Sequence, residues 1–187
     1  NALDANTTGD SNTAMGTNAL GVNTTADNNT AFGRSALSDN STGANNTAVG
    51  SLTLDANTTG SYNTAIGSNA LGANTTGEDN VAVGRSALAA VTTNSYNTAV
   101  GDRALTVNTA ELNTAVGSLS AYSNTSGTEN TAIGQASLYT NTTGSYNTAV
   151  GRYALRLNTT ASHNTAVGRN ALTANSGGSY NTAVGGS

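Results

Sequence analysis

The sequence contains no cysteine, proline or tryptophan, and all six of its basic residues are arginine. The absence of cysteine excludes disulfide bonds and thiolate chemistry, and it leaves the redox compartment open. Aromatic residues make up 4% of the chain and apolar residues 36%, much of it alanine, so 187 residues cannot fill the thick interior of a globular domain. The arginines are scattered and the net charge is −4, which excludes the basic stripe of a nucleic-acid-binding protein.

Charged residues and long apolar runs are also scarce. Charged residues make up 9% of the chain, against roughly a quarter in average proteins. No apolar run approaches the roughly 18 residues that span a bilayer, so we expect no membrane insertion. Asn, Thr, Ser and Gly take the place of charge, a composition that is also typical of disorder. The periodicity of the sequence argues against disorder.

The motif Asn-Thr-Ala-apolar-Gly recurs along the whole chain, with successive copies 17 residues apart except for one step of 16. A repeat of this length indicates a solenoid. We number the repeat from its first Asn, so that position 3 is Ala, position 4 a larger apolar residue and position 5 Gly in every copy. Position 9 is Leu except at Ala121, and position 12 is Asn except at Val91. The position-1 residues are Asn12, Asn29, Asn46, Asn63, Asn80, Asn97, Asn113, Asn130, Asn147, Asn164 and Asn181.

Seventeen residues with two Gly and several Asn and Thr cannot form a good helix. We therefore predict an all-β fold, a parallel β-solenoid of about eleven 17-residue coils that forms one domain over residues 1–187. Positions 2–5 are predicted to form a short strand, and a second short strand is predicted around the Ala-Leu pair at positions 8 and 9. We expect the side chains at positions 4 and 9 to point inward, and the small residues at positions 3 and 5 to form a flat outer face.

The repeated Asn residues have a structural role in this fold. Identical amides stacked one per coil hydrogen-bond along a ladder, and Asn tolerates the left-handed backbone of tight corners. The eleven position-1 residues are thus predicted to form one ladder, and those at position 12 a second. The 16-residue repeat lacks one residue around 109–112, in a connection where a deletion shortens a loop without shifting a strand.

The small interior of each coil predicts self-association. Two large apolar side chains per coil contribute about 1.5–3 kcal/mol each, whereas ordering each backbone residue costs on the order of 1–2 kcal/mol. We expect chains to pack laterally through the flat Ala/Gly face, with a trimer as the preferred form. The unpaired edge of the last coil predicts end-to-end stacking into filaments, or a segment cut from a longer fibre.

The repeat resembles the head repeat of YadA-like trimeric autotransporter adhesins, most closely in Asn80-Val81-Ala82-Val83-Gly84, and also phage tail-fibre-like β-solenoid repeats. This resemblance implies a left-handed parallel β-roll, three of which form a rod displayed outside the cell that adheres to matrix or surfaces. It also implies apolar core positions at residues such as Val49, Ile66 and Val100. The adhesin heads use about fourteen residues per coil, and the neck, stalk and membrane anchor of that family have no counterpart in these residues.

No set of residues suggests catalysis, a cofactor or a metal site. His163 is the only His, so no Ser/His/Asp arrangement exists, and we interpret it as an exposed loop residue. Acidic residues recur in the connection, but the Gly-Gly-x-Gly-x-Asp repeats of calcium-binding β-rolls are absent. We interpret the Arg residues that follow position 5 as solvated turns rather than anion sites, and the Tyr residues at position 17 as corner packing rather than sugar platforms. These residues are Arg34, Arg85, Arg152 and Arg169, and Tyr62, Tyr96, Tyr146 and Tyr180.

Asn-x-Ser/Thr acceptor patterns occur in most repeats. If the source organism glycosylates exported proteins, a glycan could stand on almost every coil. We favour the simpler interpretation that Asn-Thr-Thr is a corner followed by β-branched residues. The candidate acceptors are Asn6, Asn23, Asn28, Asn40, Asn45, Asn57, Asn74, Asn124, Asn141 and Asn158.

The sequence as a whole favours a non-enzymatic, extracellular or cell-surface structural and adhesive fibre. Its expected partners are further copies of itself and cell-surface, matrix or glycan ligands, with no nucleic acid. The alternative is an ice- or glycan-binding solenoid, because Thr residues at positions 13 and 14 could form a regular hydroxylated plane. A polysaccharide-cleaving β-helix would need a cluster of carboxylates in one or two coils, and none is visible.

Overall fold

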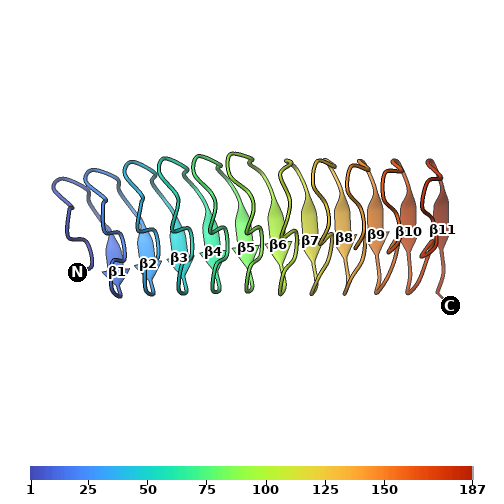
Figure 1. Cartoon of the computed structure of the whole chain (residues 1–187), viewed down its shortest axis with the longest axis horizontal. Coiled ribbons are helices and arrows are strands. Elements are labelled where there is room, and N and C mark those ends of the chain that lie inside the picture. The colour runs from blue at the N-terminus through green and yellow to red at the C-terminus, as the bar shows by residue number, and fades with distance from the viewer. Residues whose placement is uncertain (187) are drawn as a thin grey trace.

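The computed structural model describes residues 1–186, which form eleven three-residue strands joined by turns and contain no helix. The strands make one parallel sheet in chain order, so that each coil adds a strand beside the previous one (Figure 1). The predicted parallel β-solenoid is confirmed. The strands are β1 (Thr13–Met15), β2 (Thr30–Phe32), β3 (Thr47–Val49), β4 (Thr64–Ile66), β5 (Val81–Val83), β6 (Thr98–Val100), β7 (Thr114–Val116), β8 (Thr131–Ile133), β9 (Thr148–Val150), β10 (Thr165–Val167) and β11 (Thr182–Val184).

Neighbouring strands pair at equal repeat positions along the whole rod. The 16-residue step does not disturb this register, because Thr98 of β6 pairs with Thr114 of β7. Position 12 also stays aligned across the short coil, since the side-chain amide of Asn124 donates to Oδ1 of Asn108 at 2.8 Å. The missing residue therefore lies between Asn108 and Asn113, where the sequence predicted it.

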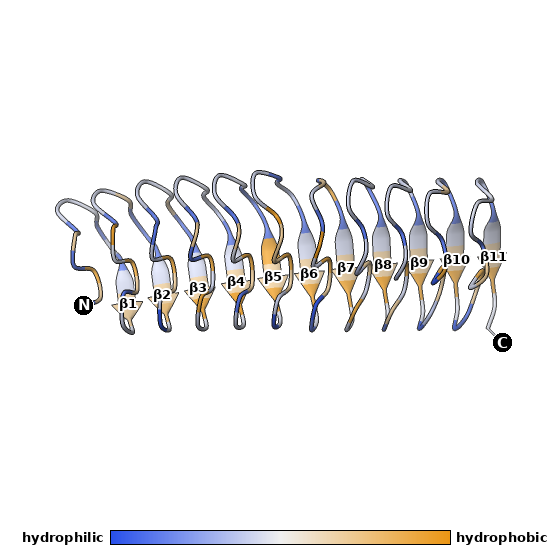
Figure 2. Ribbon diagram, viewed as in Figure 1, coloured by the Kyte–Doolittle hydropathy of each residue, from blue (hydrophilic) through white to orange (hydrophobic). Residues whose placement is uncertain are grey.

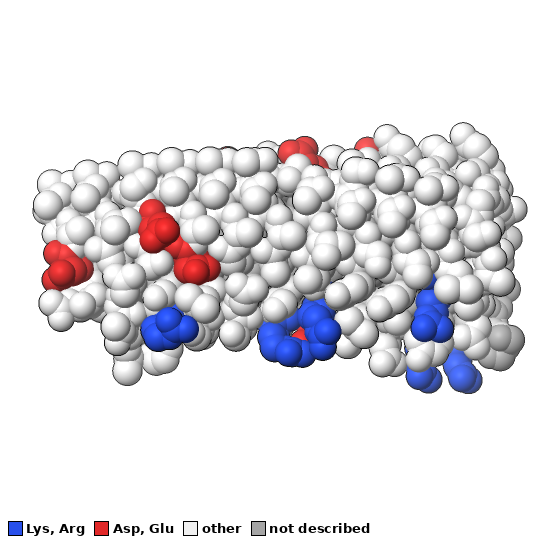
Figure 3. Space-filling model, in the orientation of Figure 1, with Lys and Arg blue, Asp and Glu red and all other residues white. Residues whose placement is uncertain are grey.

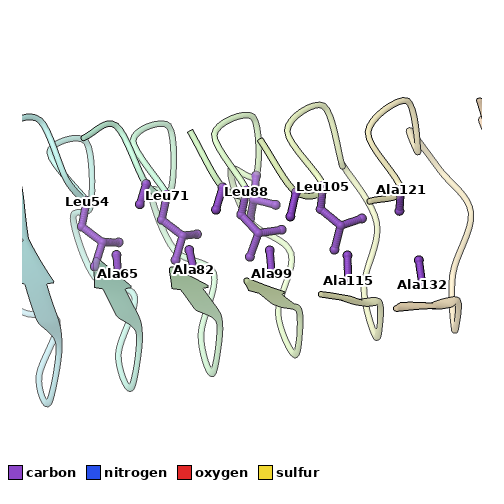
Figure 4. Packing of buried hydrophobic residues seen from close by; sticks show 14 of the residues in the cluster. Leu54, Ala65, Leu71, Ala82, Leu88, Ala99, Leu105, Ala115, Ala121 and Ala132 are labelled. Atoms are coloured by element: carbon purple, nitrogen blue, oxygen red, sulfur yellow. The ribbon is translucent and has the colours of Figure 1, made fainter. Parts of the chain in front are cut away.

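The interior is a thin layer of Ala and Leu. Position-3 Ala residues on the strands are fully buried from Ala31 to Ala166, and position-9 Leu residues from the opposite wall lie over them, as Leu71 does over Ala82 in Figure 4. The prediction for position 9 is confirmed, whereas the prediction that position 4 points inward is wrong. A methyl group on the strand leaves space for the Leu, and strand alternation then directs positions 2 and 4 outward.

The second predicted strand is wrong, because positions 8 and 9 form a turn. The N–H of Ala19 donates to the carbonyl of Gly16 at 3.2 Å in the same coil, and the N–H of Leu20 donates to Ala36 in the next coil at 3.0 Å. Every position-9 residue has a left-handed backbone, with φ 49° at Leu20 and 46° at Ala121. Such a backbone costs about 1–2 kcal/mol per residue, and complete burial of the Leu side chain offsets that cost.

Glycine at position 5 is required by the close approach of neighbouring coils. All eleven of these glycines have a positive φ, which is 136° at Gly101. A Cβ atom on Gly101 would lie 2.6 Å from the carbonyl carbon and oxygen of Gly117 in the next coil. Position 5 therefore fixes the corner at which the chain leaves the strand.

Candidate functional site

The described residues 1–186 contain no pocket, no group of His, Cys, Asp or Glu that could hold a metal ion, and no helix able to cross a membrane. The acidic connection residues instead make separate contacts, such as the backbone N–H of Asp10 donating to Oδ1 of Asp27 at 2.7 Å. The features that remain as candidate sites are the long outer surfaces of the rod.

The outer surface of the sheet carries two parallel ranks of side chains, which we call the strand face. Position 2 supplies Thr in ten coils and Val81 in β5, and position 4 supplies an apolar side chain in all eleven. Figure 2 shows β5 as apolar along its length, whereas the other strands begin at the more polar Thr. Seven position-4 residues are exposed, from 36% at Val167 to 78% at Val184, and the other four are partly exposed. The strand face thus presents a continuous apolar stripe along the rod that is at least partly open to solvent at every strand.

The position-1 Asn side chains link each coil to both neighbours. Oδ1 of Asn80 accepts the backbone N–H of Asn97 at 3.0 Å, and its Nδ2 donates to the carbonyl of Asn94 at 2.9 Å and to Oδ1 of Asn63 at 3.2 Å. Equivalent bonds to the backbone N–H recur from Asn12 to Asn181. These eleven residues form a hydrogen-bonded ladder, and those from Asn29 to Asn164 are buried.

The position-12 Asn side chains form a second ladder, with one interruption. Nδ2 of Asn74 donates to Oδ1 of Asn57 at 2.8 Å, and similar bonds link Asn6 to Asn57. The next position-12 residue is Val91, which has no amide to donate. Oδ1 of Asn74 is consequently the one buried side-chain N or O atom without a hydrogen-bond partner in the described part of the chain. The ladder resumes at Asn108 and continues to Asn175.

The fold buries most of the candidate glycosylation acceptors. Asn23, Asn40, Asn57, Asn74, Asn124, Asn141 and Asn158 are fully buried, and each of their side-chain amides donates within the interior. A glycan on these seven residues would not fit the folded coil. Asn6 is partly buried, and Asn28 and Asn45 at position 17 are exposed.

The Thr residues at positions 13 and 14 have different surroundings. The position-13 hydroxyls donate along the rod, as Thr58 does to the carbonyl of Thr75 at 3.0 Å. The position-14 hydroxyls, such as that of Thr59, are exposed and make no hydrogen bond within the described residues. The position-13 rank is therefore largely engaged within the rod, whereas the position-14 rank is free to bind water, and the hydroxylated plane considered from the sequence stays a prediction.

The position-17 side chains stack on one another where consecutive coils carry rings. The His163 ring lies between those of Tyr146 and Tyr180, with centroids 4.8 Å apart on each side and the planes within 6° of parallel. The stacked rings cover each other's faces. His163 therefore offers only its ring edges to the solvent, whereas Tyr146 and Tyr180 each have one face covered by His163 and remain exposed.

Two ion pairs share Asp102 near the middle of the rod, and the one with Arg85 joins neighbouring coils. Arg85 donates through Nε and Nη2 to the two carboxylate oxygens of Asp102, at 2.8 and 3.2 Å, and Nε of Arg103 lies 3.4 Å from Oδ2 of Asp102. The hydrogen bond from Arg85 holds the pKa of Asp102 below its usual value. By contrast, burial, aided by the charge of Asp39, raises the pKa of Asp55.

A cluster of Arg and Tyr lies farther along the rod, and sequence reasoning had singled out only Arg152 from it. The guanidinium of Arg156 lies 4.9 Å from the ring centroid of Tyr153 and 5.9 Å from that of Tyr139, and Arg152 lies 4.4 Å from the ring of Tyr153. Tyr122 stacks on Tyr139 with a centroid distance of 5.4 Å. The signal was present in the sequence, because Tyr122, Tyr139 and Arg156 all occupy position 10 of consecutive repeats.

Comparison of the chain with protein-family models, with curated proteins and with solved structures finds no match.

Proposed function

We propose that this protein is a non-enzymatic structural rod that assembles with copies of itself through the strand face, and that the assembled fibre is displayed outside the cell as an adhesive element. The observation that carries the proposal is the apolar stripe at position 4, which is exposed at seven strands, partly exposed at the other four, and aligned in one register along the sheet. Contiguous exposed apolar surface on a soluble protein marks an interaction site. The resemblance to YadA-like adhesin heads supports a trimer and an extracellular location.

The proposed contact surface is the strand face, whereas the sequence predicted contact through the Ala and Gly residues at positions 3 and 5. Position-3 Ala residues are buried, so they cannot form an outer contact face. The side chains at positions 2 and 4 take that place, and they offer more apolar area per coil than Ala and Gly would.

The test is the mass of the purified chain in solution, measured by light scattering during size-exclusion chromatography. We expect three times the chain mass of 18.4 kDa. The double variant Ile66→Glu with Val100→Glu places two charges on the strand face and should give the single-chain mass. Thr59→Glu with Thr76→Glu adds the same charge at exposed position 14 and should leave the oligomer intact. A single-chain mass for the parent protein at high concentration would contradict the proposal.

Ice binding is the second candidate, and the position-2 Thr residues favour it. Their hydroxyls make no hydrogen bond within the described residues, and they recur at about 4.8 Å along the rod, with the position-4 side chains about 6.6 Å away along each strand. A regular grid of free hydroxyl and methyl groups suits an ordered water lattice. Thermal hysteresis of the purified protein tests this function, and Thr64→Tyr with Thr98→Tyr should abolish it. Absence of hysteresis in the parent protein would exclude this candidate.

A further inference from the structure

The rod contains one place where a carboxylate is already held by arginine. Arg85 and Asp102 both occupy position 6, on adjacent coils, and the guanidinium forms a two-pronged contact with the carboxylate, at 2.8 and 3.2 Å. Arg103 approaches the same carboxylate from position 7. Position 6 of adjacent coils is therefore spaced so that a guanidinium on one coil reaches an acidic group at the next.

The same geometry recurs farther along the rod without the acidic group. Arg152 and Arg169 occupy position 6 of adjacent coils, so the place that Asp102 fills beside Arg85 holds a second guanidinium beside Arg152. Both side chains are exposed, as is that of Arg156, and none of the three forms an ion pair within residues 1–186. Within the described residues, the two arginines at these aligned positions thus have no counter-charge of the kind that Asp102 supplies to Arg85.

Tyrosine side chains contact two of these three arginines, Arg152 and Arg156. Nη2 of Arg152 donates to the hydroxyl of Tyr153 at 2.8 Å, and the Tyr153 ring lies within 4.9 Å of both Arg152 and Arg156. The hydrogen bond to Tyr153 uses one N–H of Arg152. The remaining N–H donors stay available for an external acceptor, because each guanidinium carries five. Holding the side chains in place lowers the entropy cost of binding a ligand.

Charge is divided unevenly along the rod. Residues 130–187 contain three Arg and no Asp or Glu, whereas residues 1–129 contain three Arg and all ten acidic residues. Figure 3 shows this uneven distribution of charge on one side of the rod. The basic atoms nearest the C-terminal end have no acidic atoms beside them, whereas the basic atoms at the middle of the rod enclose acidic atoms. An anion is thus attracted to the last third of the rod even though the whole chain has a net charge of −4.

We propose that Arg152, Arg156 and Arg169 form a binding site for the carboxylate or sulfate groups of an acidic polysaccharide that lies along the rod. The surrounding surface favours a polysaccharide over an acidic peptide. The polar residues of the chain are mainly Thr, Ser and Asn with few charges, and such groups pair with sugar hydroxyls. The proposal rests on the adhesive function proposed above, for which it names the class of ligand.

The experiment measures retention of the purified rod on immobilised heparin and on immobilised polygalacturonate, with neutral dextran and polyglutamate as comparison matrices. Retention is measured at about 0.02 M salt, where screening is weak, and elution follows a salt gradient. We expect the parent protein to bind both acidic polysaccharides and to pass through dextran. Arg169→Asp supplies Arg152 with an internal carboxylate, as Asp102 does for Arg85, and should weaken binding at least tenfold.

Arg34→Asp is the matched control, because it makes the same substitution at position 6 of another coil and changes the net charge equally. It should alter binding less than twofold, and both variants should keep the thermal unfolding midpoint of the parent. Equal weakening by the two variants, retention on polyglutamate as firm as on the polysaccharides, or no retention of the parent protein would each overturn the proposal. Oligomer mass is recorded on the same samples, so that lost retention with unchanged mass counts against this site and leaves the self-assembly proposal standing.

Discussion

Each coil has two polar corners that differ in how much variation they accept. On the strand side, position 1 is Asn and position 5 is Gly in every copy of the motif. On the return side, position 12 is Val once, position 15 is Gly, Ala or Asn, and one coil lacks a residue altogether. The rod is therefore strict along one edge and permissive along the other, although both edges carry buried Asn ladders.

The two edges differ in tolerance because the Asn side chains of the two ladders accept hydrogen bonds from different groups. Oδ1 of a position-1 Asn accepts a backbone N–H of the next coil, as Asn80 does from Asn97. Oδ1 of a position-12 Asn that has a following coil accepts only side-chain amides, as Asn57 does from Asn74. Replacement of the next amide by Val91 therefore leaves the side-chain atom Oδ1 of Asn74 unpaired, while the carbonyl of Asn94 keeps its bond from Asn80. Unpaired buried backbone groups are rare in proteins, which explains why the strand side is the stricter one.

The largest effect is expected from Gly101→Ala on the strand side. The new methyl group would lie 2.6 Å from Gly117 carbonyl atoms, on a backbone with φ 136°. Strain and overpacking together should destabilise the rod by about 3–5 kcal/mol, measured by urea unfolding. Gly60→Ala at position 15 is the return-side control. Its methyl group would also press on a backbone carbonyl, that of Gly77, but the backbone of Gly60 is not left-handed. Ala26 and Ala161 already occupy that position in other coils, so the coil should adjust at a cost of about 1 kcal/mol. Equal costs for the two variants would remove the distinction between the corners.

The next largest loss of stability is expected from Asn80→Val. This variant places Val instead of Asn in the strand-side ladder, as Val91 already does in the return-side ladder. The backbone N–H of Asn97 and the carbonyl of Asn94 would both lose a partner, at a cost of about 2–4 kcal/mol in unfolding free energy. Hydrogen exchange of the Asn97 amide should accelerate in the variant. A cost below about 1 kcal/mol would show that the ladder contributes little.

Val91→Asn should restore the missing amide of the return-side ladder and so raise the stability of the rod. A new amide at this position can donate to Oδ1 of Asn74, the unpaired buried atom. We expect a gain of about 1 kcal/mol, seen as a higher urea midpoint with an unchanged slope. Val91→Ala serves as the control, since it removes apolar volume without adding a donor, and it should destabilise the rod.

The smallest effects are expected at two partly exposed carboxylates outside both ladders, those of Asp55 and Asp102. Burial raises the pKa of Asp55 in the fold, so its contribution to stability is present in acid and is lost as the pH rises through that raised pKa. Asp55→Asn should therefore be slightly more stable than the parent protein at pH 7 and equal to it at pH 3. Asp102 has a lowered pKa, so Asp102→Asn should have the opposite sign, with the parent losing its small advantage as the pH falls. Thermal unfolding across this pH range measures both.

The sequence predicted the period, the parallel register and the location of the shortened connection, because all three depend only on the alignment of repeats. It did not predict which strand face is buried. Apolarity alone places Val49 inside and Ala48 outside, yet the structure buries Ala48 and leaves Val49 partly exposed. The deciding quantity is the thickness of the interior, which depends on Leu54 and its equivalents reaching across from the opposite wall.

The turn at positions 8 and 9 could not be predicted from the sequence either. Leu is an ordinary strand or helix residue, and nothing in an Ala-Leu pair indicates a left-handed backbone. That conformation is imposed by bonds to the two neighbouring coils. The ladders, in contrast, correspond to Asn repeats that were visible in the sequence. The unpaired Oδ1 atom of Asn74 could be identified only from the structure, which shows the direction in which each amide donates.

The left-handed Leu at position 9 has a consequence for how the rod forms. A lone coil would bear this backbone strain with few hydrogen bonds of its own, since most of its bonds run to adjacent coils. Folding is therefore a nucleation problem in one dimension: the first pair of coils is costly, and each later coil adds to a finished template. Such a rod should lengthen or unravel coil by coil from its ends, and its stability should rise with the number of repeats.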